Sequence, residues 1–277
     1  MSSLQGDSYI FTNSQQNMDF KNTTYIIMGG TTGMGLAAAI ALKTHGANVV
    51  VIGRNPESCK NAGELLGKDA ISLSGDATDP WTIEMAIKLA HDAFGNINGL
   101  FHVAGGSGRK WGDGPLDKIT LEGWNKTMEL NLTSLMLSNQ AMVNYFLEHK
   151  KEGAILNMGS VLGFSPSPKY FVTHAYAAAK SAVIGFSKSV AAYYADQNIR
   201  VNVIAPSLFI TPMAQRAAED EQILKFLKTK QPIDGGRAGL PEDINNAVLM
   251  FLHPDSKFIT GQMLAVDGGW SISEGQY

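Results

Sequence analysis

Hydrophobic residues fall in short runs along the chain from residue 24 onward, and these runs alternate with longer alanine-rich or amphipathic stretches. Apolar runs that are rich in β-branched residues and bounded by glycine or proline predict buried β-strands. The sequence contains seven such runs, at residues 24–28, 48–52, 70–73, 99–105, 154–158, 200–205 and 262–269, the last of which ends in a glycine turn.

The stretches between these runs predict α-helices. Pro80 opens one stretch and Gly95 closes it, while Gly46 closes another, as expected from the preference for proline in a first helical turn and glycine after a last one. The expected helices span residues 34–46, 56–67, 80–95, 120–149, 175–195, 213–230 and 241–252. Strands that alternate with helices indicate a parallel sheet covered on both faces. We therefore predict an α/β fold, a single doubly wound Rossmann-type domain with a seven-stranded parallel sheet and a ligand crevice at the carboxyl ends of the strands.

The first 20 residues are polar and rich in Asn, Gln and Ser, without the basic start and apolar core of a signal peptide. We expect residues 1–20 to form a flexible arm and residues 21–277 to form the domain. No apolar stretch reaches the roughly 18 residues of a membrane span. The single cysteine, Cys59, allows no intrachain disulfide, which favours a reducing compartment and predicts a cytoplasmic protein.

Composition narrows the classes of function. Hydrophobic residues make up 44% of the chain and charged residues 17%, as in a globular protein with a large core. The formal net charge is −3, and no cluster of Lys and Arg suggests a nucleic-acid partner. His102, His149 and His174 lack the spacing of metal ligands, so we expect no metal.

A glycine-rich loop, Gly29-Gly30-Thr31-Thr32-Gly33-Met34-Gly35, lies between the first expected strand and the first helix. Glycines at such a junction permit a tight turn and the close approach of a pyrophosphate to a helix N-terminus, which predicts a dinucleotide site. The spacing G-x-x-x-G-x-G differs from the common G-x-G-x-x-G, and a simple turn is the alternative.

The end of the second strand bears on the choice of cofactor. An NAD site commonly places an acidic residue there for the ribose hydroxyls, but this chain has Gly53 followed by Arg54. A guanidinium matches a phosphate group in planar, bidentate fashion. Arg54 therefore favours NADP over NAD, the alternative being an arginine on an exposed loop.

Tyr176 and Lys180 are four residues apart in the alanine-rich run HAYAAAK. Residues at this spacing share one helix face, and a nearby cation would lower the pKa of the phenol. The pair predicts a general acid/base, whereas a half-buried tyrosine beside a solvated lysine is the alternative.

These motifs together resemble the short-chain dehydrogenase/reductase family over about residues 22–270. Asn131, Ser160, Tyr176 and Lys180 resemble its catalytic tetrad, Asp76-Ala77 resembles the pair that contacts adenine, and VNVIAPSLFIT resembles the segment that holds the nicotinamide. The resemblance implies a cofactor site formed by Gly29, Thr31, Thr32, Gly33, Met34, Gly35, Arg54, Asn55, Asp76, Ala77, Ala104, Gly105, Tyr176, Lys180, Pro206, Phe209 and Thr211.

The sequence departs from the family pattern in places. His102-Val103-Ala104-Gly105 replaces Asn-Asn-Ala-Gly, and Thr32 stands where many NADP-dependent members carry a basic residue. Ser160 and Tyr176 are 16 positions apart, about three more than is common in the family. Counting back by the common spacing leads to Gly163, but the motif leads to Ser160 at the strand end. Because loops absorb insertions, we predict Ser160, with the extra residues of 164–173 bulging outward over the substrate mouth.

The resemblance implies a mechanism. In carbonyl reduction NADPH gives hydride to carbon, Tyr176 gives a proton to oxygen and Ser160 polarises the carbonyl. Lys180 also grips the nicotinamide ribose, and Asn131 holds a water that relays protons. Structural roles are the alternatives: Ser160 could cap a turn, and Asn131 could satisfy backbone groups in a helix kink.

We predict NADPH-dependent reduction of a small-molecule ketone, with a 3-oxoacyl thioester and a small cyclic ketone as candidates. NAD(P)-dependent oxidation of an alcohol or sugar is a second hypothesis, and a regulator that binds dinucleotide without turnover is a third, although it would be expected to lose the Tyr/Lys pair. Helices 120–149 and 175–195 are expected to pair in a homodimer or homotetramer. Arg109-Lys110-Trp111 could bind an anionic substrate or form a solvated loop, and Phe164, Tyr170, Phe171 and Phe209 could line a pocket or belong to the core.

Overall fold

The computed structural model describes residues 18–276 and is organised around one seven-stranded sheet with the order β3-β2-β1-β4-β5-β6-β7. All neighbouring strands are parallel. The strands are β1 (Thr24–Met28), β2 (Asn48–Gly53), β3 (Ala70–Ser74), β4 (Gly99–His102), β5 (Gly153–Met158), β6 (Ile199–Pro206) and β7 (Met263–Val266). The strand order reverses between β1 and β4, which is where a doubly wound sheet forms its ligand crevice. The predicted fold class is confirmed.

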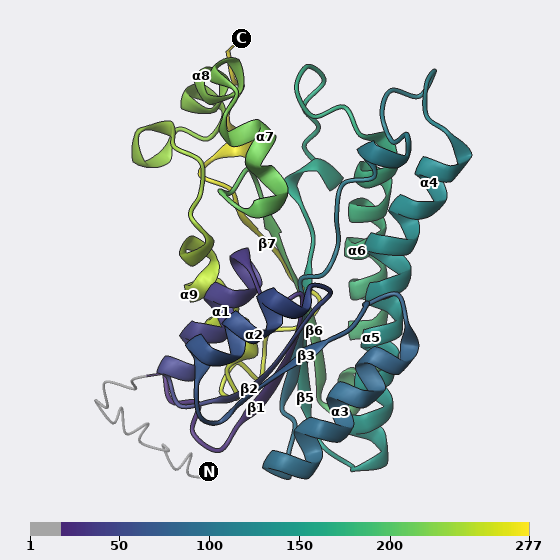
Figure 1. Cartoon of the computed structure of the whole chain (residues 1–277), viewed down its shortest axis with the longest axis vertical. Coiled ribbons are helices and arrows are strands. Elements are labelled where there is room, and N and C mark those ends of the chain that lie inside the picture. The colour runs from purple at the N-terminus through teal and green to yellow at the C-terminus, as the bar shows by residue number, and fades with distance from the viewer. Residues whose placement is uncertain (1–17, 277) are drawn as a thin grey trace, which may run out of the picture.

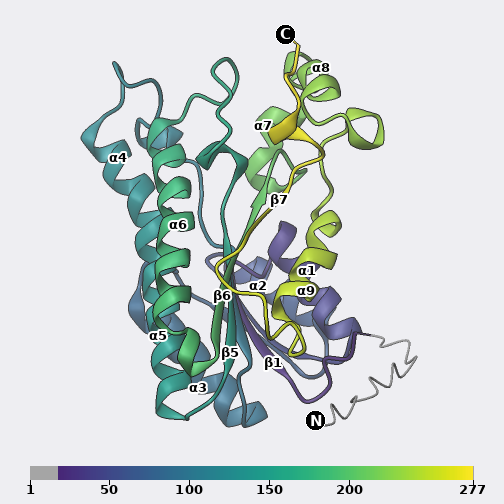
Figure 2. The ribbon, with the colours of Figure 1, turned by 180° about the vertical axis from the view of Figure 1, so that it is seen from behind.

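Helices cover both faces of the sheet (Figures 1 and 2). One face carries α1 (Gly33–Thr44), α2 (Pro56–Leu66) and α9 (Asn245–Leu252). The other carries α3 (Pro80–Phe94), α4 (Leu121–Met128), α5 (Ser134–Glu148) and α6 (His174–Tyr193). Two shorter helices, α7 (Gln215–Ala218) and α8 (Glu221–Lys230), follow β6 and lie beyond its carboxyl end.

The core consists of two apolar layers, one on each face of the sheet. Side chains alternate between faces along a strand, so Ile27 and Val51 pack with Leu42 of α1 while Ile26 and Val50 pack with Phe146 of α5. Every residue of β1 and β6 is buried. Burial on both faces explains why these strands read as continuous apolar runs rather than alternating ones.

Several expected elements are shorter than the sequence predicts. The expected strand 99–105 ends at His102, because the next two amides, those of Val103 and Ala104, both donate to the Met28 carbonyl at 2.8 Å. The expected helix 120–149 is interrupted by a π turn at Glu129–Thr133. The expected helix 213–230 is divided at Asp220, whose side chain accepts hydrogen bonds from the first amides of α8.

The N-terminal arm was predicted to span residues 1–20, but Phe20 belongs to the folded body. Its ring is fully buried and packs edge-on against Tyr25 and His253, and its amide donates to the His45 carbonyl at 2.9 Å. The arm prediction is therefore wrong at its last residue, where an aromatic side chain fills the end of the core. Residues 1–17 lie outside the described part of the chain.

The lengths of the helices and the single cysteine, Cys59, bear on the predicted location. Among the helices of residues 18–276, none is both long and apolar enough to cross a bilayer. The Cys59 thiol is buried and donates weakly to the carbonyls of Gly53 and Leu73 at 3.3 and 3.5 Å. The cytoplasmic location stays a prediction.

A buried amide network connects β5 to α5 and to α6, the helix that carries Tyr176 and Lys180. Asn157 and Asn139 of α5 exchange two hydrogen bonds of 2.9 Å, and the Asn157 amide also donates to the Ser187 hydroxyl of α6 at 3.0 Å. All three side chains are buried. Because a buried polar group without a partner is costly, this network fixes α5 and α6 relative to the strand between them.

We expect Asn157→Ala to lower the free energy of unfolding by about 3 kcal/mol, since it removes three hydrogen bonds and leaves buried partners unsatisfied. Urea unfolding at fixed protein concentration, followed by circular dichroism, measures the change. Asn61→Ala is the matched control, because Asn61 is exposed on α2. Equal stability of the two variants would contradict a structural role for the network.

Candidate active site

A cavity of about 870 Å³ opens at the carboxyl edge of the sheet. This is the size of a small-molecule or cofactor site. The cavity is lined by segments that follow β1, β2, β3, β4, β5 and β6, and these segments contain every sequence-predicted site residue except Gly35. Gly35 has a packing role instead: a Cβ there would come within 2.1 Å of the Gly29 carbonyl oxygen, so glycine lets the first turn of α1 approach the end of β1.

The glycine-rich loop presents unsatisfied backbone donors to the cavity. Gly29 has a φ of +84°, and a Cβ there would meet the Ala104 amide at 2.8 Å, so no larger residue fits this turn. α1 begins at Gly33, and the N-cap residue Thr32 makes no side-chain capping bond. The first amides of α1 are thus available for an anion, and the helix dipole favours negative charge there.

The loops after β2 and β3 form the other end of the cavity. A Cβ at Gly53 would come within 2.0 Å of the Thr31 hydroxyl, so the tight packing of this turn excludes an acidic side chain at position 53. Arg54 follows and is exposed to the cavity, and within residues 18–276 its guanidinium forms no ion pair. The Asp76 carboxylate accepts hydrogen bonds of 2.9 Å from the amide and hydroxyl of Thr78, which shapes the loop beside Ala77.

These features fit a dinucleotide. The uncapped N-terminus of α1 matches a pyrophosphate, and the glycines leave space for it without side chains. Arg54 lines the same cavity. Asn55 lines the cavity, and its side chain accepts a hydrogen bond from the Ser58 amide and caps α2. Its predicted contact with the cofactor stays a prediction.

Ser160 and Tyr176 meet at the opposite end of the cavity. Ser160 lies two residues after the end of β5, and Tyr176 lies in the first turn of α6. Both side chains line the cavity, and the Ser160 side chain by itself lowers the pKa of the phenol. Gly163 instead packs against α6, where a Cβ would meet the Ser181 amide at 2.8 Å. The structure therefore brings Ser160, and not position 163, to the tyrosine. The Ser160 hydroxyl also caps a short turn by accepting from the Leu162 amide at 3.2 Å.

Asp113 positions the tyrosine, a role that was not predicted from the sequence. Its two carboxylate oxygens accept hydrogen bonds from the amides of Ala175 and Tyr176 at 3.0 and 3.1 Å. Asp113 is buried and acts as an N-terminal anion for α6. A cap is normally sought next to its helix in sequence, but this carboxylate is 62 residues away from Ala175.

Lys180 is buried behind the tyrosine. Its ammonium donates to the Met158 carbonyl at 2.8 Å and lies 5.6 Å from the centre of the Tyr176 ring. Burial lowers the pKa of Lys180 to about 8 and raises the pKa of Tyr176 to about 12. The expectation of a lowered phenol pKa is thus wrong for the protein alone, because dehydration of the hydroxyl outweighs the lowering effect of Ser160.

Asn131 lies in the π turn between α4 and α5 and pins the loop after β4. Its amide donates to the carbonyls of Gly106 and Thr127 at 2.8 and 2.9 Å, and its carbonyl accepts from the Gly106 amide at 3.1 Å. The bond to Thr127 competes for an oxygen that a regular helix would use, which accounts for the π turn. A Cβ at Gly105 would come within 2.7 Å of the Asn131 oxygen and 3.6 Å of the Lys180 ammonium. Asn131 and Lys180 therefore flank the same point, and the predicted water relay stays a prediction.

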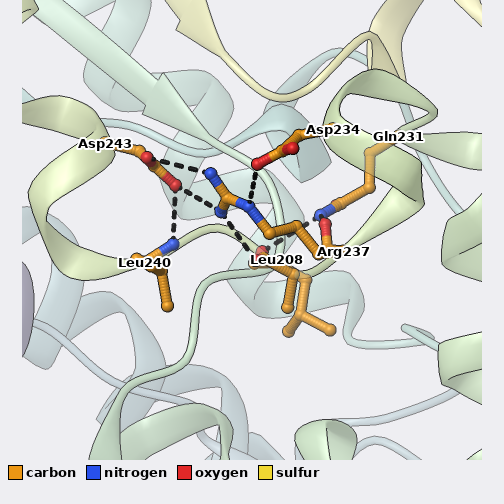
Figure 3. A network of polar contacts seen from close by, with 7 residues as sticks. Leu208, Gln231, Asp234, Arg237, Leu240 and Asp243 are labelled. Carbon is orange, nitrogen blue, oxygen red and sulfur yellow. Dashed lines mark hydrogen bonds and ion pairs between the residues drawn. The ribbon is translucent and has the colours of Figure 1, made fainter.

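Pro206 ends β6, and the segment that follows it, with Phe209 and Thr211, is held from outside by a polar network (Figure 3). The buried Gln231 amide donates to the Leu208 carbonyl at 3.4 Å and to the Arg237 carbonyl at 2.7 Å. Arg237 in turn pairs with Asp243 at 2.6 Å and with Asp234 at 2.5 Å. This network keeps Phe209 buried against Gly239 at the cavity wall.

The loop between Ser160 and Tyr176 was predicted to bulge outward over the substrate mouth, but part of it packs against the rest of the protein. Phe171 packs edge-on against Trp270 at 5.6 Å, and the Trp270 indole donates to the Ser165 carbonyl at 3.2 Å. Tyr170 packs against Phe226 of α8. The loop is therefore folded onto an aromatic cluster, and Phe171 and Trp270 line the cavity. Of the other aromatic candidates, Phe164 is exposed.

His102 replaces a family asparagine and is buried beneath the cavity. Its ring contacts the Ser138 hydroxyl at 2.7 Å, and burial together with the Lys180 charge lowers its pKa to about 3. His102 is thus neutral and structural. Within residues 18–276, no group of three His, Cys, Asp or Glu side chains is arranged to hold a metal ion.

Comparisons with known proteins agree with this geometry. Residues 29–271 match a family model described as enoyl-(acyl carrier protein) reductase. The chain is 32% identical over 252 residues to the 3-oxoacyl-[acyl-carrier-protein] reductase FabG of Vibrio cholerae, a match that covers 91% of this chain and 98% of that protein. It is 33% identical over 250 residues to the 2,5-dichloro-2,5-cyclohexadiene-1,4-diol dehydrogenase LinX of Sphingobium indicum, covering 89% of this chain and 95% of that protein.

A solved structure of a similar protein has the same fold. The short-chain type dehydrogenase/reductase from Mycobacterium ulcerans superposes with a TM-score of 0.84 at 27% identity, covering 93% of this chain and 92% of that one. The family model spans most of the chain and the curated relatives are matched over nearly their whole length. The chain therefore belongs to the short-chain dehydrogenase/reductase family and is an NAD(P)-dependent oxidoreductase.

Proposed function

We propose that the chain is an NADPH-dependent reductase of small-molecule ketones. The observation that carries the proposal is a single cavity lined by Ser160, Tyr176 and the glycine-rich loop before α1, with the Lys180 ammonium 5.6 Å from the centre of the Tyr176 ring. Two hydroxyl donors in the same cavity are suited to a carbonyl oxygen that gains negative charge.

Each residue has a defined task in this reaction. NADPH, when bound, supplies the hydride that the carbonyl carbon receives. Tyr176 donates its phenolic proton to the carbonyl oxygen, and Ser160 donates a hydrogen bond to the same oxygen as charge develops. The raised pKa of Tyr176 keeps the phenol protonated in the free protein, which is the form that reduction requires. Lys180 favours the phenolate that is left after proton transfer, because its ammonium lies 5.6 Å from the centre of the ring.

The substrate class is narrowed but not named by these features. The relative FabG is a 3-oxoacyl-[acyl-carrier-protein] reductase, which supports a 3-oxoacyl thioester, whereas LinX is a cyclohexadiene-diol dehydrogenase, which supports a cyclic ketone or alcohol. Alcohol oxidation remains the second candidate, because proton transfer through Tyr176 is reversible. The intact Tyr176–Lys180 pair argues against a dinucleotide sensor without turnover.

A panel of ketones, 3-oxoacyl thioesters and alcohols, assayed by absorbance of the nicotinamide, tests the reaction. On the best substrate, Ser160→Ala should lower turnover about 10²–10³-fold, as loss of one oxyanion donor does, and Tyr176→Phe should cost at least as much. Affinity for NADPH should stay nearly unchanged in both variants. Tyr193→Phe, at an exposed position of α6, is the matched control. Normal turnover in Ser160→Ala together with an inactive Ser165→Ala would show that another serine polarises the carbonyl.

The preference for NADPH is supported by two features of the loop after β2. The packing of Gly53 against Thr31 excludes an acidic side chain there, and Arg54 is unpaired beside the cavity within the described chain. A dinucleotide without the 2′-phosphate would lack the charge-assisted contact to this guanidinium.

We expect Arg54→Ala to weaken NADPH binding about 10- to 150-fold while leaving NADH binding nearly unchanged, which corresponds to the loss of charge-assisted hydrogen bonds. Fluorescence titration with both reduced cofactors measures the two affinities. Lys60→Ala, an exposed cation of α2 outside the cavity, controls for the change in net charge. Tighter binding of NADH than of NADPH by the unmodified protein would refute the preference.

We also propose that the chain assembles as a homodimer or homotetramer. Large apolar side chains are exposed on the helices of one face, including Leu121 and Trp124 of α4, Leu147 of α5 and Tyr193 of α6. Apolar side chains left exposed on one face are candidates for a protein interface. Sedimentation at micromolar concentration should give a species of two or four chains, and a stable monomer of 29.8 kDa would refute assembly.

A further inference from the structure

The Tyr176 end of the cavity has an uneven distribution of charge. Besides Arg54 and Lys180, three cationic side chains line the cavity, namely Arg109, Lys110 and Arg216. The one carboxylate among the described lining residues is Asp76, which lies with the loops that follow β2 and β3 at the other end. An uncharged ketone would gain no binding free energy from these cations, so they indicate a further role.

The two arginines lack internal partners. Within residues 18–276, the guanidinium groups of Arg109 and Arg216 form neither ion pairs nor hydrogen bonds to side chains. Lys110 differs, because its ammonium lies over the Trp111 ring at 4.1 Å. Both arginines line the same cavity, and partial burial and then the charge of Arg216 lower the pKa of Arg109.

Two cations that line one cavity without an ion-pair partner among the described residues would gain free energy from an anion there, since like charges repel. Asp113 is the acidic group that acts on Arg109, but both of its oxygens already accept hydrogen bonds from the amides of α6. Because Asp113 acts on Arg109 and also binds the amide of Tyr176, Arg109 lies on the Tyr176 side of the cavity. Arg109 precedes α4 and Arg216 belongs to α7, so the pair is formed by segments more than a hundred residues apart in sequence.

We propose that Arg109 and Arg216 bind an anionic group, a carboxylate or a phosphate, carried by the ketone substrate. Guanidinium groups hold both anions through paired N–H donors, and an anion between them would replace repulsion by attraction. The assignment rests on the proposed ketone reduction and makes this pair the determinant of substrate specificity. The cofactor pyrophosphate is the competing partner, but the uncapped N-terminus of α1 already provides for it.

Two matched substrate pairs test the assignment and separate its two anions. The first pair is an oxo acid, 5-oxohexanoate, and its methyl ester; the second is acetoacetyl-coenzyme A and the uncharged acetoacetyl-N-acetylcysteamine. We expect kcat/KM to favour the charged member of at least one pair about 10-fold or more, the lower end expected for charge-assisted hydrogen bonds. Preference within the first pair identifies a carboxylate, and preference within the second identifies a phosphate.

The variants Arg109→Gln and Arg216→Gln should each remove most of that preference while leaving kcat/KM for the uncharged member within about twofold. Lys225→Gln is the matched control, because it removes one exposed cation of α8 outside the cavity. The preference in the unmodified protein should also decline between 0.05 and about 1 M salt, where screening shortens to about 3 Å. Equal kcat/KM within both pairs, or a preference that survives both substitutions, would overturn the assignment.

Two further readouts separate this assignment from the cofactor and from the proposed function. NADPH titration should give the same affinity in Arg109→Gln, Arg216→Gln and the unmodified protein; a tenfold loss would assign the arginines to the cofactor instead. Trp111 and Trp270 line the cavity, so their fluorescence reports binding of the charged compounds without turnover. Binding that is lost in the two variants but without reduction of any ketone would refute the proposed function alone. No binding and no preference would refute the anion site.

Discussion

The site depends on the close approach of backbone segments at the carboxyl edge of the sheet. At Gly35 a Cβ would come within 2.1 Å of the Gly29 carbonyl oxygen, and at Gly29 a Cβ would come within 2.8 Å of the Ala104 amide. These contacts press the N-terminus of α1 against the ends of β1 and β4. One constraint thus sets both halves of the cavity, because the same approach exposes the first amides of α1 and directs the loop at Gly105 toward Asn131 and Lys180.

Burial then sets the protonation states of the catalytic pair. Dehydration raises the pKa of Tyr176 and lowers that of Lys180, each by favouring the neutral form. A protonated phenol is already the right form for giving a proton to a carbonyl oxygen, so reduction needs no prior lowering of its pKa. Oxidation needs the phenolate, and that direction therefore depends on further positive charge near the ring. The same residues can serve both directions, but the free protein is set for reduction.

Local pattern was sufficient for the strands, the glycine loop and the pair at positions 176 and 180, because each is encoded within a few consecutive residues. Contacts between distant residues were not predictable in this way. Asp113 holds the start of α6 from 62 residues away, and the Asn131 bond that accompanies the π turn depends on the loop at Gly106 as well as on the helix itself. Phe20 read as the end of a polar arm because its partners, Tyr25 and His253, come from opposite ends of the chain. The phenol pKa was misjudged for a related reason, since spacing reveals a neighbouring charge but not the loss of water around a hydroxyl.

Selectivity must arise outside the catalytic pair, because a phenol and a serine hydroxyl recognise any carbonyl oxygen alike. The remaining walls of the cavity come from three segments that the strand ends do not fix: the turn at Arg109–Trp111, the long loop before α6, and α7. The loop is anchored by aromatic packing on Trp270 and Phe226, so it supplies an apolar wall of defined shape. The other two segments supply Arg109 and Arg216, whose guanidinium groups form no ion pair among the described residues. A substrate that satisfied both walls would be apolar near its ketone and negatively charged at a distance from it, since the apolar wall gains from burial and the cations gain from an anion.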